Sequence, residues 1–404
     1  MSSVAGVIDA ALAEELRRLL GTANVTAGQG LQTIQVRPAP AAAGTGAAAI
    51  AGILKLAGHH GVGVSTAGDL PGGIELRLDQ WNQVVAVDRE NLCLTVQPRA
   101  VTRRVLDRLA EEGLCLPPDP CLKPGIWAGG EVIAGYAATR RVLGVEAILP
   151  DGCPVRLGGP LGADQLELGL ARLILGTGGP LGVVTALYLQ LGYLAPVSAI
   201  LLAGFAQVEE ARSALFALGG RPEMAGACFE CLDFSLLVDG PTCDHLLSYA
   251  GYGGMLILEL TGPNLEVVEE AYARAGSLCR EAGALEVLAA DNPAARQRVK
   301  KVREYFMAFV GSGNPPAYLT GPVRREWPDL ARAGGLTVPY CRLEGGTLCL
   351  ALAGSAQGSA LPRFLAGLDR AAGRDEAVPG VLARIGQALD PGAVLTAASG
   401  ILKG

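Results

Sequence analysis

The stretch Val142-Leu143-Gly144-Val145-Glu146-Ala147-Ile148-Leu149-Pro150-Asp151-Gly152 predicts a buried strand that ends in a tight turn. Upstream, residues 74–78, 84–87 and 93–96 predict further strands, and a helix is expected over 101–112. Downstream, 183–191 predicts another buried strand. Helices over 8–20 and 47–59 open the chain, because aliphatic residues recur there at helical spacing. Strands and helices therefore mix in this half of the chain.

The second half starts near Pro196 and alternates strands with helices. This order predicts a sheet with helices on one face. The predicted strands are 198–206, 227–233, 254–261, 284–289 and 345–352, and the predicted helices are 208–218, 241–250, 264–282, 293–309, 360–371 and 378–388. Helix 293–309 carries a basic cluster, for which a solvated helix face is favoured over an anion or partner site.

The composition argues for a globular protein of two or three domains. Half of the 404 residues are hydrophobic and 18% are charged, so the chain can bury enough apolar surface to offset its conformational entropy. The formal net charge of -6 argues against a general nucleic-acid binder, which would present a basic surface to the phosphates.

A mean hydropathy of +0.34 raises the question of a membrane span. The uncharged stretch Leu173 to Val208 is long enough for one. Gly178-Gly179-Pro180 and Pro196 interrupt it, which favours buried strands joined by a turn. The N-terminus lacks the pattern of a signal peptide, so a cytoplasmic protein is expected.

The ten cysteines are expected to be small buried residues, not a disulfide framework. Cys228 and Cys231 form the only CxxC pair, and Cys243 and His245 could complete a zinc site. A buried strand over the same residues is the favoured interpretation, and the metal site stays open as an alternative.

Several segments follow one another in the order of a known family. They are Val36-Arg37-Pro38, Gly72-Gly73-Ile74, 88–96, Pro117-Pro118-Asp119-Pro120, Gly129-Gly130, 142–146 with 149–152, Leu173-Ile174-Leu175-Gly176 with 181–185, and Ala388-Leu389-Asp390-Pro391-Gly392. The chain resembles the FAD-linked oxidases with the fold of vanillyl-alcohol oxidase and p-cresol methylhydroxylase. Within that family it is most similar to glycolate oxidase FAD-binding subunits and D-lactate dehydrogenases.

The resemblance implies an α+β fold of two domains. These are a p-cresol methylhydroxylase-type FAD-binding domain over 1–195 and a ferredoxin-like α+β cap over 196–375, with a segment 376–404 that returns to the FAD domain. It also implies a set of FAD contacts. The residues at the matching positions are Thr66, Ala67, Gly68, Gly72, Gly73, Pro118, Asp119, Gly129, Gly130, Gly135, Gly182 and Val183.

Two loops that face the cofactor in the family are shorter here. The pyrophosphate loop corresponds to residues 65–71, which include Asp69 and Pro71. A carboxylate there would repel a phosphate, and proline removes a backbone donor. The second loop contracts to residues 131–140. FAD binding is therefore expected to be possible but doubtful.

The histidines that serve metal binding and substrate chemistry in the family are also missing. The corresponding stretches are 341–349 and 354–358, and the chain has only His59, His60 and His245. His59 and His60 are expected to cap a helix or face solvent. No catalytic or metal-binding residue is therefore assigned.

These departures favour a degenerate, non-catalytic subunit of a FAD-linked 2-hydroxyacid oxidoreductase complex. Its expected partners are a catalytic FAD-linked homologue, an iron–sulfur subunit or both, and it could be membrane-associated through them. The alternative is a functional FAD-binding oxidoreductase or electron-transfer subunit with an altered site, for example with Tyr136 or Glu344 as base. A third hypothesis is a metal- or redox-responsive module built on Cys228, Cys231 and Cys243.

Overall fold

The chain forms two compact units in the computed structural model. Described residues within 1–117 and 142–192, together with Leu395, belong to the first unit, and those within 193–353 form the second. The predicted domain limits at 195 and 375 stay a prediction. The structure describes residues 10–27, 33–38, 45–66, 70, 72–117, 142–162, 164–176, 181–224, 227–237, 251–311, 317–322, 325–333, 336–344, 347–353, 388 and 395.

The first unit begins with a small sheet in the strand order β1-β2-β4-β3. Strands β2, β4 and β3 are parallel, and β1 is antiparallel to β2. Leu12, Leu16 and Ile50 on two helices are fully buried in its core. The elements are α1 (Ala10–Leu20), a 3-10 turn (Thr22–Asn24), β1 (Val25–Ala27), β2 (Ile34–Val36), α2 (Thr45–His60), β3 (Val64–Ser65) and β4 (Ile74–Leu76).

A second, antiparallel sheet completes this unit in the order β5-β6-β10-β8-β9. The predicted turn between its first two strands is present, because Asp88 Oδ1 accepts hydrogen bonds from the backbone N–H groups of Glu90 and Asn91. The elements are β5 (Val84–Asp88), β6 (Cys93–Val96), α3 (Thr102–Glu111), β7 (Leu114–Cys115), β8 (Val142–Ile148), β9 (Pro154–Gly158), α5 (Gln165–Gly176), β10 (Val183–Gln190) and β11 (Gly192–Tyr193).

One hydrophobic core joins the two sheets of the first unit. Ile148 on β8 and Val183 on β10 belong to the same buried cluster as residues of α2, β3 and β4. Leu395, far along the chain, lies in that cluster too and forms a parallel bridge with Val64 of β3.

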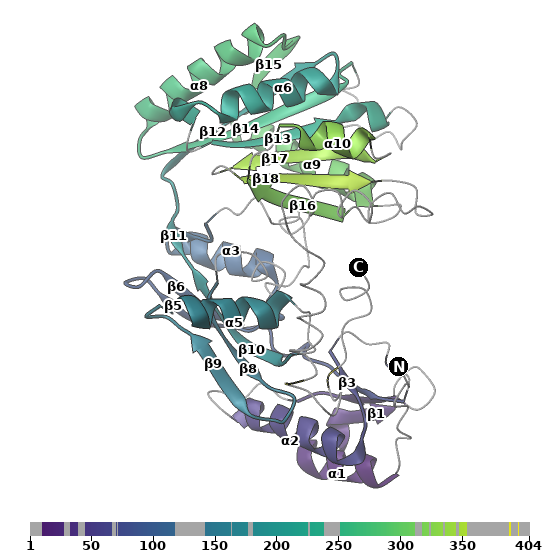
Figure 1. The fold of residues 1–404 in the computed structure, drawn as a ribbon. Helices are drawn as coiled ribbons and strands as arrows, with labels where there is room; N and C mark the ends of the chain where they lie inside the picture. Colours follow the sequence, from purple (N-terminus) through teal and green to yellow (C-terminus); the bar gives the residue numbers. More distant parts are fainter. Residues whose placement is uncertain are drawn as a thin grey trace. The chain divides into compact units, whose positions relative to one another are not determined.

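The second unit contains the predicted ferredoxin-like arrangement (Figure 1). The order β12-α6-β13-β14-α8-β15 along the chain gives the antiparallel strand order β15-β12-β14-β13 in the sheet. Three more strands extend it as β17-β18-β16. The elements are β12 (Val197–Phe205), α6 (Val208–Gly219), β13 (Ala227–Asp233), β14 (Gly254–Gly262), α8 (Leu265–Glu281), β15 (Glu286–Ala289), α9 (Pro293–Gly311), β16 (Ala317–Pro322), α10 (Trp327–Ala333), β17 (Thr337–Glu344) and β18 (Thr347–Ala353), with 3-10 turns at Pro222–Met224 and Phe234–Leu237.

Helices cover both faces of the second sheet, so the prediction of helices on one face is wrong. Helices α6, α8 and α10 pack on one face through an apolar cluster that includes Phe229 and Cys231. Helix α9 packs on the other face, where Val299, Val302 and Phe306 meet Leu232 and further strand residues. The helix over residues 293–309 was predicted, but its sequence does not indicate which face of the sheet it covers.

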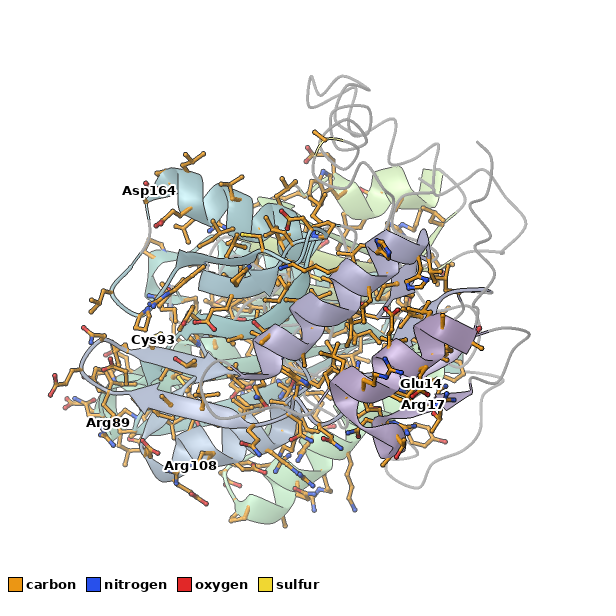
Figure 2. The ribbon with its side chains drawn as sticks, turned by 90° about the horizontal axis from the view of Figure 1, so that it is seen from below. Glu14, Arg17, Arg89, Cys93, Arg108 and Asp164 are labelled. Carbon is orange, nitrogen blue, oxygen red and sulfur yellow. The ribbon has the colours of Figure 1, made fainter. Side chains whose placement is uncertain are left out.

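The uncharged stretch 173–208 also differs from expectation. Leu173 to Gly176 is the last turn of α5 and not a strand, and β10 starts at Val183. Asp164, labelled before α5 in Figure 2, accepts a hydrogen bond from the Glu167 N–H group and so caps the helix. None of the helices in the described part of the chain combines the length and hydrophobicity that crossing a bilayer requires.

Candidate functional site

Gly72 and Gly73 stand at the entry to β4, beside Gly63 at the start of β3. Gly72 has a φ of +75°, a conformation that favours glycine. A Cβ on Gly73 would lie 2.9 Å from the Gly63 carbonyl oxygen, so the close approach of the two strands requires glycine there. Gly72 is half-buried, and Thr66, which follows the other end of β3, is exposed.

Gly182 and Val183 stand at the start of β10, at the other side of the same core. Val183 pairs with Ile148, and a Cβ on Gly182 would come within 3.2 Å of the Ile148 carbonyl oxygen. The core that holds Val183 also holds Val64 of β3. The structure therefore brings two of the predicted FAD-contact segments to one core between the two sheets.

The described residues of this region fit a dinucleotide in one respect. Gly72, Gly73 and Gly182 at the strand starts carry no side chain, and Thr66 is exposed after the end of β3. The other predicted contacts lie outside the described residues, as do Asp69, Pro71, Tyr136 and the loop 131–140. Those contacts are Ala67, Gly68, Pro118, Asp119, Gly129, Gly130 and Gly135.

The second unit carries a buried polar cluster on the sheet face that α9 covers. Glu230 on β13 lies opposite Arg342 on β17, and Cys228 lies between Glu344 and Glu259 in the next cross-strand row. Their exposed fractions are small, at 5% for Glu230 and 7% for Arg342. Charged groups buried to this degree are rare unless they are paired.

Glu230 is the centre of this cluster. The Tyr340 hydroxyl donates a hydrogen bond of 2.8 Å to Oε1, and Arg303 Nε on α9 lies 2.5 Å from Oε2. The second contact lacks hydrogen-bond alignment and is an ionic contact. Arg342 Nη1 lies 3.7 Å from Oε1. Two cations and one hydroxyl thus converge on a single carboxylate.

Two further carboxylates hold the arginines from the outside. Arg342 Nη2 donates to Glu344 Oε2 at 2.7 Å, and Arg303 donates to Glu259 Oε2 at 3.4 Å from each terminal nitrogen. The cluster therefore contains three carboxylates and two guanidinium groups, all paired with one another.

These surroundings fix the protonation states. Burial alone would raise the pKa of the Glu230 carboxyl, but Arg303 and Arg342 outweigh it and the pKa is lowered. Burial raises the pKa of the Tyr340 hydroxyl and of the Cys228 thiol well above their ordinary values. Glu230 stays charged at neutral pH, while Tyr340 and Cys228 keep their protons.

The cysteine pair that suggested a metal site is split between the two faces of β13. Cys228 belongs to the polar face, whereas Cys231 packs in the apolar cluster under α6 and α8. Within the described residues, no three His, Cys, Asp or Glu side chains come together in a way that could hold a metal ion. Cys243 and His245 lie outside the described residues. Burial is confirmed for Cys93, Cys228, Cys231, Cys279, Cys341 and Cys349, whereas Cys153 is exposed.

His60 has a more specific place than expected. Its Nε2 atom lies 3.4 Å from Glu15 Oε2 on α1, so the ring links α2 to α1. The ring of His59 meets that of His60 edge to face at a centroid distance of 5.4 Å. Neither contact indicates a role in catalysis.

The sequence did not predict the polar cluster. Arg303 was grouped with the solvated bases of α9, yet it points into the sheet. One signal was available, because Glu230 interrupts the apolar run of a strand that is buried along its whole length. A single acid in such a strand requires a buried cation, but the sequence cannot say which one.

Two family models match the chain. The model described as FAD binding domain matches residues 45–158, and the model described as FAD linked oxidases, C-terminal domain, matches residues 195–321. Together they span well over half of the chain. The first of them runs through the region of the shortened loops, so the expected doubt about FAD finds no support.

Curated relatives point in the same direction. Glycolate oxidase subunit GlcD of Bacillus subtilis is 30% identical over 231 residues, which is 54% of this chain and 47% of that protein. D-lactate dehydrogenase of Anaerostipes hadrus is 25% identical over 302 residues, 67% of this chain and 62% of that protein. The chain thus spans between about half and under two thirds of the length of these two relatives.

Solved structures share the fold. p-Cresol methylhydroxylase with substrate bound superposes with a TM-score of 0.68 at 14% identity, covering 96% of both chains. Alkyldihydroxyacetonephosphate synthase gives a TM-score of 0.64 at 12% identity, covering 97% of this chain and 86% of that one. These likenesses confirm the predicted fold.

Proposed function

Because the chain belongs to the FAD-linked oxidases, we propose that it is a subunit of a FAD-linked oxidoreductase complex that acts on a 2-hydroxy acid. The similarity to a glycolate oxidase subunit and to a D-lactate dehydrogenase supports this substrate class. In this proposal the chain binds FAD but does not itself carry out the substrate chemistry.

One observation carries the non-catalytic role, namely the closed charge network around Glu230. Removing a proton from a hydroxyl group requires a base whose pKa lies near the working pH. Glu230 has a lowered pKa and is held by two arginines, so it is a weak base. Tyr340 and Cys228 stay protonated at neutral pH. Glu344, the alternative base, is ion-paired with Arg342.

The first unit supplies the residues that would hold FAD. Gly72, Gly73 and Gly182 would let the backbone come close to the cofactor, and the Thr66 hydroxyl would offer a hydrogen bond. FAD, when bound, supplies two-electron redox chemistry. In a non-catalytic subunit the same residues serve to bind and orient the cofactor for a partner.

An exposed apolar surface supports membership in a complex. Leu161, Leu166 and Leu170, at and before α5, have exposed fractions of 90%, 71% and 41%. Contiguous apolar groups on a surface often mark a protein interface. A catalytic FAD-linked homologue or an iron–sulfur subunit is the proposed partner, in the cytoplasm or at a membrane through that partner.

Flavin analysis and turnover of the purified chain test the proposal together. Flavin is released by acid and quantified, and oxidation of glycolate and D-lactate is followed with an artificial electron acceptor. Near-stoichiometric flavin without turnover is expected. A colourless chain that takes up no added FAD would refute the cofactor assignment, and turnover by the chain alone would refute the non-catalytic role.

The second candidate is a working oxidoreductase or electron-transfer subunit with an altered site. It is favoured by the match of both family models in their expected order. The same assay distinguishes this candidate from the non-catalytic subunit, because a working oxidoreductase requires that a substrate or a reductant reduce the flavin in the isolated chain.

A further inference from the structure

The surroundings of Glu230 have the composition of a site that binds a carboxylate. Two guanidinium groups and a tyrosine hydroxyl face its two oxygens, from α9 and β17. Arginine is the side chain best suited to a planar carboxylate, because its donors form a rigid fork. Here the carboxylate comes from the chain itself.

The donors are held in place independently of Glu230. Arg303 is also ion-paired with Glu259, and Arg342 is also ion-paired with Glu344. Tyr340 is 1% exposed and packs in the core under α9. Loss of the Glu230 side chain would therefore leave an arrangement of donors that is already oriented, which lowers the cost of binding a ligand.

The rim of the cluster is more exposed than its centre. The side chain of Arg303 is 26% exposed and that of Glu259 is 38% exposed, whereas Glu230 behind them is 7% exposed. In a chain without the Glu230 side chain, this rim is the side from which a small acid would enter.

We propose that Arg303, Arg342 and Tyr340 form a pocket for a small monocarboxylate, and that Glu230 occupies this pocket as a built-in ligand. Shortening Glu230 opens the pocket to acids such as acetate, glycolate or lactate. The biological meaning rests on the proposed function, since an occupied pocket would keep the cap from binding a 2-hydroxy acid.

The test is chemical rescue of Glu230→Ala in the full chain. The midpoint of thermal unfolding is measured against increasing sodium acetate, glycolate and D-lactate, with acetamide and sodium chloride at matched concentration and ionic strength. A saturable rise with the carboxylates alone is expected, because a ligand that binds only the folded chain stabilises it. Half-saturation should fall in the millimolar range, given the few atoms of these ligands.

Two variants serve as controls. Glu230→Gln keeps the side chain in the pocket and should not respond. Glu259→Ala removes the outer carboxylate of Arg303 but leaves Glu230 in place, so it should not respond either. A response of equal size to acetamide or chloride, or the same response in Glu230→Gln, would overturn the proposal.

The outcome is decisive even if Glu230→Ala is unfolded in plain buffer. The variant is then refolded from urea at increasing acetate, and carboxylate-dependent refolding is expected. Failure to refold at any acetate concentration, while Glu230→Gln folds, would refute the pocket. Flavin content and turnover play no part in this readout, so its failure is distinguishable from a failure of the proposed function.

Discussion

The two faces of strand β13 show how one buried strand serves two kinds of core. Phe229 and Cys231 point into the apolar cluster under α6 and α8, and their neighbours Cys228 and Glu230 point into the charged cluster under α9. All seven residues of the strand are buried. Burial by itself therefore does not dictate apolar side chains, provided that the opposite elements supply matching charges.

A second carboxylate, Asp233, lies at the end of the same strand on the apolar side. Arg212 of α6 donates to Asp233 Oδ2 at 3.3 Å and to the Val338 carbonyl oxygen at 2.6 Å. Burial raises the pKa of Asp233, and the single arginine and the Ser235 hydrogen bonds do not reverse this. At Glu230, two arginines do reverse it. The number of arginines beside each buried carboxyl therefore decides whether its pKa is raised or lowered.

The largest expected effect is on the apolar face. Phe229→Ala should lower the free energy of unfolding by about 3 to 5 kcal/mol, because it removes a 2% exposed ring and leaves a cavity. Urea unfolding followed by circular dichroism measures it. Phe229→Leu should lose far less, and a loss below 1 kcal/mol for the alanine variant would contradict the packing described.

On the charged face, Glu230→Gln should cost about 3 kcal/mol at neutral pH, because it leaves two buried guanidinium groups without their central anion. A carboxyl whose pKa is lowered by folding stabilises the folded chain at pH values above its ordinary pKa of 4.5. This stabilisation is lost as the pH falls through the lowered pKa of the folded chain. The gap between wild type and variant should therefore close below pH 4.5. A gap independent of pH would contradict the assignment.

Asp233→Asn should show the opposite dependence on pH. With its raised pKa, folded Asp233 binds a proton at a pH where the unfolded chain has already lost it, so folding is favoured as the pH falls. Relative to the variant, the wild type should therefore gain stability as the pH falls through the raised pKa toward 3.8. Unfolding midpoints at a series of pH values measure this, and a wild type that gains stability relative to the variant as the pH rises would count against it.

The smallest effect is expected at the rim of the charged cluster. Glu259→Gln should change the free energy of unfolding by less than about 1 kcal/mol, because this carboxylate is 38% exposed and water screens its pairing with Arg303. The change should shrink further in high salt. A loss as large as that of Glu230→Gln would mean that the rim and the centre of the cluster are not distinct.

The family resemblance predicted the ferredoxin-like unit, and most of its strands along the chain were predicted because turns and apolar runs are strong local signals. β13 was predicted with its observed limits, since Ala227 to Leu232 is an apolar run that only Glu230 interrupts. Helix α5 was missed because its leucines continue into an uncharged stretch whose glycines and proline suggested strands. Strand β17 was missed because Arg342 and Glu344 are charged, yet they pair inside the sheet face.

The site was less predictable than the fold. Gly72, Gly73, Gly182 and Val183 lie around one core. The order of the family motifs along the chain had already grouped these residues as cofactor contacts. The Glu230 cluster joins residues more than 100 positions apart, as the hydrogen bond from Tyr340 shows. Such pairing is set by strand register and by the placement of α9, and neither can be obtained from the spacing of charges along one chain.

The bridge between Val64 and Leu395 has a consequence for synthesis on the ribosome. Every residue of the cap leaves the exit tunnel before Leu395 does, so the cap can fold while the first core still lacks this buried side chain. Strand β3 is thus completed by a residue more than 300 positions later in the chain. The core of the first unit can therefore be completed only after the second unit has been synthesised.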